Sequence, residues 1–193
     1  MNNYIKISIV FLSIIMFQSF CFSQNSKYEN EKYVIVLDVQ QYYTDNCMPK
    51  KDADEMVKSI NSLIGKTNPE KVIYVKSLYG AVALSISFKG FKIDTIPANE
   101  FDKNLVLINN TIFNKTDGNA FLANGLLEYL KQKGVKDIIV TGLLAERCVT
   151  KTTQGGISSG FNIYLLSDAI GGKSNRSKAK AIKKLVKMGA KQL

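Results

Sequence analysis

The apolar run YVIVL at residues 33–37, followed directly by Asp38, decides the fold class of this chain. A continuous apolar run rich in β-branched residues is typical of a strand buried on both faces, as the strands of parallel sheets are. Similar runs predict further strands at 72–75 (VIYV), 137–141 (DIIVT) and 161–166 (FNIYLL), and the stretch 105–113 is expected to contain one more.

Segments with apolar residues at helical spacing separate these runs. They predict helices over 52–64, 118–132, 148–159 and 178–188, whereas residues 77–104 show no clear periodicity. Repeated strand–helix alternation implies βαβ units. We therefore expect a doubly wound α/β domain with a mostly parallel sheet and helices on both faces.

The first 23 residues have the layout of a secretory signal peptide. Lys6 precedes an apolar run over 7–17, and Cys21 and Ser23 stand at −3 and −1 of a cleavage site before Gln24. We therefore predict an exported protein, periplasmic or secreted, whose domain spans 24–193 and is not stably inserted in a membrane after cleavage. An uncleaved anchor is disfavoured because the run is shorter than the ~20 residues of a spanning helix. Acylation of Cys21 is disfavoured because Phe20 stands where a small residue is expected.

The formal net charge is +10, and many of the lysines lie between Lys173 and Lys191. A nucleic-acid or anionic-surface patch is one interpretation. The other is the solvated face of an amphipathic closing helix. We favour the closing helix and expect no nucleic-acid partner, because no aromatic residues interleave the lysines for base stacking.

The sequence contains no histidine, and signal cleavage would leave only Cys47 and Cys148. The absence of histidine excludes Ser-His-Asp and Cys-His sites and every histidine-based zinc site. Two cysteines do not make a disulfide framework. In an exported protein, however, they could pair, either as a structural bridge or as a redox gate on the site.

Three reactive residues fall at or just beyond predicted strand ends, where parallel sheets bind ligands. Asp38 follows the first strand, Lys115 follows the 105–113 region, and Cys148 lies where a helix should begin. A helix N-terminus and an ammonium both lower the pKa of a thiol, and a carboxylate can take its proton. Together these residues could activate a thiol without histidine.

Three segments in this order carry a resemblance to a known family. Asp38 and Gln40, with Tyr43 five residues after the aspartate, match D-x-Q-x-x-F except for tyrosine at the aromatic position. KTDGNAF at 115–121 matches K-x-x-x-S-A-F with Asn119 at the hydroxyl position, and TGLLAERCV at 141–149 matches the nucleophile segment T-G-x-x-x-x-x-C-V. Over about residues 32–190 the chain resembles the isochorismatase-like cysteine hydrolases.

The resemblance implies a six-stranded parallel sheet and a catalytic triad of Asp38, Lys115 and Cys148. Cys148 would attack an amide-type carbonyl and form a thioester that water hydrolyses. The N–H groups of Leu144 and Cys148 would form the oxyanion hole, in a loop with a cis peptide at Leu143–Leu144.

The substrate pocket is less clearly marked in the sequence. We expect Gln40, Tyr43, Tyr79 and Phe121 to line it. For the three aromatic residues, burial in the core is the alternative.

Departures from the family pattern narrow the expected activity. Nicotinamidases of this superfamily use an aspartate and two histidines to bind a divalent metal, so the absence of histidine predicts no metal, no cofactor and no nicotinamidase activity. Isochorismatases proper cleave a vinyl ether and lack the nucleophilic cysteine, so that activity is the less favoured enzymatic alternative.

The expected function is an exported hydrolase that cleaves a C–N bond of a small amide, carbamoyl or ureido substrate. The alternative from another class is an exported small-molecule-binding protein with a vestigial triad. Relatives are commonly dimers or tetramers, which leaves self-association open.

Overall fold

The computed structural model describes residues 32–193 except 88–89 and 98–99, and for residues 79–97 only the backbone. The predicted signal peptide, residues 1–23, lies outside the described residues. Within the described part, no helix is long and apolar enough to cross a membrane.

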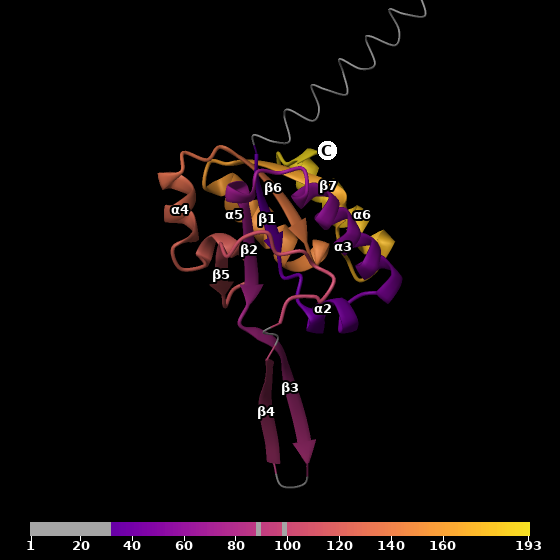
Figure 1. Ribbon diagram of the computed structural model, residues 1–193. Coiled ribbons are helices and arrows are strands. Elements are labelled where there is room, and N and C mark those ends of the chain that lie inside the picture. Colours follow the sequence, from indigo (N-terminus) through magenta and orange to yellow (C-terminus); the bar gives the residue numbers. More distant parts are fainter. Residues whose placement is uncertain (1–31, 88–89, 98–99) are drawn as a thin grey trace, which may run out of the picture. The chain divides into compact units, whose positions relative to one another are not determined.

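The central element is a six-stranded parallel sheet with the strand order β5-β2-β1-β6-β7-β8 (Figure 1). This confirms the predicted α/β class. The strands are β1 (Tyr33–Leu37), β2 (Val72–Ser77), β5 (Ile112–Lys115), β6 (Asp137–Gly142), β7 (Asn162–Ile170) and β8 (Lys191–Gln192). The unassigned region forms a separate antiparallel hairpin of β3 (Tyr79–Ser87) and β4 (Gly90–Pro97).

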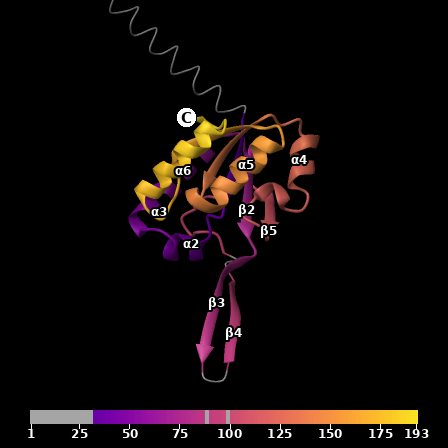
Figure 2. The same cartoon turned by 180° about the vertical axis from the view of Figure 1, so that it is seen from behind.

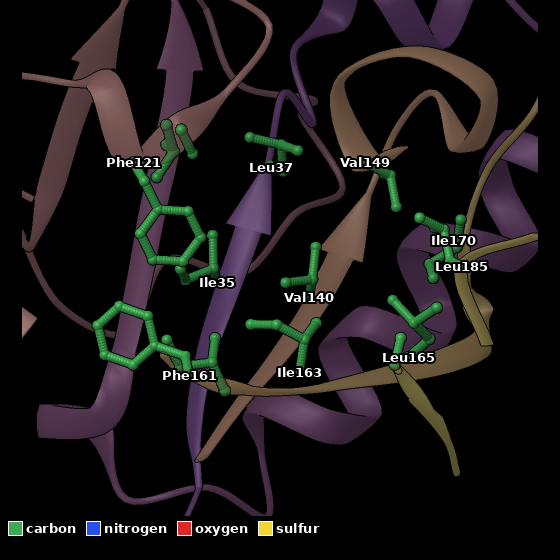
Figure 3. Close-up of a cluster of buried hydrophobic side chains, with 14 of the residues drawn as sticks. Ile35, Leu37, Phe121, Val140, Val149, Phe161, Ile163, Leu165, Ile170 and Leu185 are labelled. Atoms are coloured by element: carbon green, nitrogen blue, oxygen red, sulfur yellow. The ribbon is translucent and has the colours of Figure 1, made fainter. Parts of the chain in front are cut away.

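Both faces of the sheet are covered, which explains why its central strand β1 is apolar throughout. Ile35 and Leu37 of β1 point into a core cluster shared with α4 (Leu126–Gln132), α5 (Thr150–Ser158) and α6 (Asn175–Lys187), part of which Figure 3 shows. Val34 and Val36 belong to the cluster on the other face, which is covered by α3 (Lys50–Ile64). Figures 1 and 2 show these helices from opposite sides of the sheet. Successive residues of one strand therefore enter different cores.

The predicted continuous helix over 118–132 is wrong. The segment forms a 3-10 turn, η2 (Ala120–Leu122), and then the short helix α4. The Asn119 side chain accepts a hydrogen bond from the Phe121 N–H at 3.0 Å, and Gly125 has a φ of 81°, outside helical geometry. As a result Leu122, expected on the apolar helix face, is 69% exposed.

The lysine-rich C-terminal segment forms the amphipathic helix α6. Its first turn is capped by reciprocal hydrogen bonds between Ser174 and Ser177. Ala181, Ile182 and Leu185 are buried, while most of its lysines are exposed. This is the arrangement expected of a closing helix.

The strand order places a topological switch point between β1 and β6. From β1 the chain continues to β2 and β5 on one side, and from β6 it continues to β7 and β8 on the other. Ligands of open α/β sheets bind in the crevice at such a point, beyond the carboxyl ends of the strands. Asp38 follows β1 and Cys148 follows β6, so both lie at this crevice.

Candidate active site

Adjacent strand ends bring Asp38, Ser77 and Lys115 together. Lys115 is the last residue of β5 and lies in register with Ser77, the last residue of β2. Asp38 follows β1, the next strand of the sheet, and has a φ of 56°, a left-handed conformation that aspartate tolerates better than most residues. The two charged side chains therefore flank Ser77.

The Lys115 ammonium is the centre of the polar contacts. Its Nζ lies 2.9 Å from Asp38 Oδ2, 2.8 Å from Ser77 Oγ and 3.6 Å from Cys148 Sγ, and it donates to the Asp117 carbonyl at 3.1 Å. The Ser77 hydroxyl donates to Asp38 Oδ1 at 2.9 Å. The structure thus brings together the three residues predicted to be catalytic, and it adds Ser77 between two of them.

Gln40 stabilises this arrangement through the backbone of Ser77. It is fully buried, its side-chain amide donates to the Ser77 carbonyl at 3.0 Å, and its side-chain oxygen accepts from the Ser77 N–H at 2.8 Å. Gln40 therefore fixes the backbone of the residue that bridges Asp38 and Lys115. It is not among the side chains that line the cavity described below.

Cys148 lies in a π-helical turn, η3 (Ala145–Val149), that leads directly into α5. Gly142 and the backbone of Gly171 position this turn beside β1. Gly142 has a φ of 102°, and a Cβ there would collide with the backbone carbonyl of Leu37. Gly171 accepts a hydrogen bond from the Ala145 N–H at 2.7 Å and thereby holds the start of the turn.

The Cys148 thiol lies between two opposite charges, the carboxylate of Asp38 and the ammonium of Lys115. Burial and the neighbouring charge of Asp38 together raise the pKa of Cys148 to about 11, although Lys115 lowers it. Burial is the largest cause, and Asp38, which lies 2.9 Å from the ammonium, offsets the effect of the Lys115 charge on the thiol. In the free protein the thiol therefore keeps its proton near neutral pH.

A cavity of about 670 Å³ opens in front of Cys148. Of the residues expected in the pocket, Tyr43 lines it, and burial raises the pKa of its hydroxyl to about 12, so that the phenol stays neutral. Phe121 instead stacks on Phe161 in the core with ring centroids 5.3 Å apart, as Figure 3 shows. Its placement favours the core alternative. The side chain of Tyr79 lies outside the described residues.

The loop after β6 contains the cis peptide expected from the family resemblance, between Leu143 and Leu144. Both leucines line the cavity. The neighbouring N–H groups of Leu143 and Ala145 donate to the carbonyls of Leu37 and Gly171, whereas the Leu144 N–H has no partner among the described residues. The Leu144 N–H is therefore free to bind a ligand oxygen.

The structure also places residues at the cavity that the sequence analysis did not select as pocket residues. Arg147, Lys173 and Cys47 line its wall, together with Tyr42 and Asn46. Cys47 and Cys148 are both free thiols. Ser77 carried one usable signal, its position two residues after a predicted strand, whereas the others lie on turns or short helices without a recognisable pattern.

Comparison with known proteins agrees with this geometry. Residues 32–193 match the family described as the isochorismatase domain. The chain is 29% identical over 147 residues to the uncharacterized isochorismatase family protein YrdC of Bacillus subtilis, covering 73% of this chain and 74% of YrdC. It is 23% identical to the secreted isochorismatase effector Isc1 of Verticillium dahliae over 142 residues, or 73% of each protein. The chain belongs to the isochorismatase-like hydrolase family.

Solved structures share the fold at low sequence identity. An isochorismatase-like hydrolase from Alkaliphilus metalliredigens has a TM-score of 0.66 at 13% identity, covering 84% of this chain and 94% of that one. The pyrazinamidase of Pyrococcus horikoshii in complex with zinc has a TM-score of 0.62 at 23% identity, covering 84% of this chain and 98% of that one. At these identities the likeness concerns the fold alone.

Proposed function

We propose that this member of the family is a cysteine hydrolase that cleaves the C–N bond of a small amide, carbamoyl or ureido compound through a thioester. One observation carries the proposal. The ammonium of Lys115 contacts both the carboxylate of Asp38 and the thiol of Cys148, and the carboxylate and thiol also line one cavity. This arrangement supplies a nucleophile, a base and a positive charge within reach of one another.

Asp38 acts as the proton carrier in this scheme. Because the pKa of Cys148 is about 11, the thiol must lose its proton as it attacks the carbonyl, and the adjacent carboxylate accepts it. The Sγ–C bond forms, the C–N bond breaks, and Asp38 returns the proton to the leaving nitrogen. Water then attacks the thioester, with Asp38 taking its proton and passing it to the departing sulfur.

Lys115 and the loop after β6 stabilise the charges that develop. The Lys115 ammonium lies 3.6 Å from Sγ, where negative charge grows as the thiol loses its proton. The N–H groups of Leu144 and Cys148 are the proposed donors to the tetrahedral oxyanion, and the unpartnered N–H of Leu144 supports this role. Each such donor contributes about 3 kcal/mol to catalysis.

We propose no metal in this mechanism. The sequence has no histidine, and the described residues contain no group of three or more Cys, Asp or Glu side chains placed to hold a metal ion. The described residues therefore offer no set of ligands for a divalent metal such as the zinc ion in the pyrazinamidase complex. Activity should survive treatment with a chelator.

The test is ammonia or amine release across a panel of small amides, N-carbamoyl compounds and ureas. Cys148→Ser should abolish turnover while the far-ultraviolet circular dichroism spectrum stays unchanged. Ser77→Ala should lower kcat more than it changes KM, because it removes the hydroxyl between Asp38 and Lys115, and Ser77 does not itself line the cavity. Turnover that persists in Cys148→Ser would refute the proposed nucleophile.

The same panel separates the hydrolase from the alternative of a binding protein. No turnover of any compound, combined with tight binding of one of them, would favour a small-molecule-binding protein. Release of pyruvate from a vinyl ether such as isochorismate would favour the vinyl ether hydrolase instead.

We also propose that the protein is exported with residues 1–23 removed. The charged start, apolar run and small residues before Gln24 support this, and Isc1 is named as a secreted protein. Mass spectrometry of the purified mature protein should find Gln24 as its first residue. A cell-associated protein that retains Met1 would contradict export with cleavage.

A further inference from the structure

Two cationic side chains on the cavity wall have no part in the hydrolytic scheme. Arg147 directly precedes Cys148, and Lys173 lies in the loop between β7 and α6. Both lower the pKa of Cys47, which lines the same cavity, although burial raises it overall. Their positive charges therefore act on the Cys47 side of the cavity.

In the part of the chain that the structure describes, neither side chain forms an ion pair with a carboxylate. The ion pairs there join Lys50 and Lys51 to neighbouring acids and Lys115 to Asp38. Asp38 is the only acidic side chain on the cavity wall among the described residues, and Lys115 already offsets it at 2.9 Å. The cavity therefore presents an excess of positive charge that a substrate anion would balance.

Hydrogen bonds hold the backbone of Lys173 beside η3, the turn that carries Cys148. Glu146 Oε1 accepts a hydrogen bond from the Lys173 N–H at 2.9 Å and from the Ser177 hydroxyl at 3.3 Å. Gly171, two residues earlier, accepts from Ala145 and donates to the carbonyl of Gly142 at 2.9 Å. Lys173 and Arg147 thus extend from two segments that are hydrogen-bonded to each other, and Glu146 is a positioning residue for the first of them.

We propose that the substrate carries a carboxylate, which Arg147 and Lys173 bind while the scissile carbonyl lies at Cys148. The inference rests on the proposed hydrolase function and specifies its substrate class: small amides, carbamoyl compounds or ureas with an acid group a few bonds from the C–N bond. A guanidinium suits this role because it donates two parallel hydrogen bonds to a carboxylate. A cavity of about 670 Å³ accommodates compounds of this size.

The kinetic test compares malonamate, succinamate and glutaramate with their methyl esters, which have the same amide but no charge. The wild type should prefer the best acid over its ester by at least about 10-fold in kcat/KM. Arg147→Gln and Lys173→Gln should each reduce that preference severalfold, because each slows the acid more than the ester. Arg176→Gln and Lys184→Gln, exposed cations of α6 away from the cavity wall, are the matched controls and should keep the preference.

Binding is measured separately so that a failure of the proposed function can be recognised. Succinate should bind the wild type and Cys148→Ser in calorimetry, more weakly at high salt, and Arg147→Gln should weaken it severalfold. Hydrolysis of esters and acids at equal rates, or no effect of either cavity substitution, would overturn the carboxylate proposal and leave the hydrolase. Absence of turnover with specific succinate binding would overturn the hydrolase and support the anion site. Absence of succinate binding would overturn the anion site whatever the turnover.

Discussion

Replacing Lys115 by methionine is expected to destabilise the protein by about 3–5 kcal/mol, because it leaves a buried carboxylate without its counter-charge. The side chains of Lys115 and Asp38 are 1% and 3% exposed, so water cannot solvate the remaining charge. The substitution also removes the donors to Ser77 and to the Asp117 carbonyl. Methionine keeps most of the volume of the lysine stem, so a cavity contributes little.

The free energy of unfolding is measured by urea denaturation near pH 7, followed by circular dichroism. Lys151→Met, on the exposed side of α5, is the matched control and should change it by less than about 0.5 kcal/mol. Adding Asp38→Asn to Lys115→Met removes the unpaired charge. The double variant should therefore be more stable than Lys115→Met alone, with a coupling energy of about 2 kcal/mol between the sites.

Two results would refute this reasoning. A loss below about 1 kcal/mol in Lys115→Met would mean that the ion pair is not buried as the structure has it. Additive effects of the two substitutions would mean that the carboxylate and the ammonium do not interact, and the proposed proton-transfer scheme would then lose its basis as well.

Three further substitution or labelling results follow from the site and its surroundings. Iodoacetamide should alkylate Cys148 slowly near neutral pH and faster up to about pH 11, because only the thiolate reacts. Asp38→Asn should speed the alkylation at about pH 8, because the substitution removes an anion that raises the pKa of the thiol. Slower alkylation of the variant would contradict this. Gly142→Ala should lower the free energy of unfolding by at least about 2 kcal/mol more than Gly160→Ala does. Both glycines have positive φ, but only Gly142 lies against backbone atoms. Equal losses of stability would refute this steric argument. Phe121→Ala should lower the free energy of unfolding by about 3–5 kcal/mol and leave KM nearly unchanged, because Phe121 is a core residue. A large rise in KM would instead indicate that Phe121 lines the substrate pocket.

The strands β1, β2 and β6 could be predicted well, because buried apolar residues follow one another in each of them, whereas the short edge strand β8 was not predicted. β1 has the predicted bounds, since an unbroken apolar run of this length is stable only when both faces are covered. The interruption of the predicted helix over 118–132 could not be foreseen, because the apolar residues there have helical spacing. A local hydrogen bond of Asn119 and the positive φ of Gly125 break the helix. Local side-chain bonds of this kind compete with the helix and leave no trace in the periodicity.

For the candidate site, the order of the motifs identified Asp38, Lys115 and Cys148, which the structure brings together at the carboxyl ends of the strands. The tertiary structure alone decided the surroundings of these residues. Ser77 bridges the pair because β2 lies between β5 and β1 in the sheet, and strand order is not encoded locally. The chain by itself determines which groups are available for chemistry. The Cys148 thiol keeps its proton because it is buried and lies close to the Asp38 carboxylate. Burial and distances between charges depend on segments that only folding brings together.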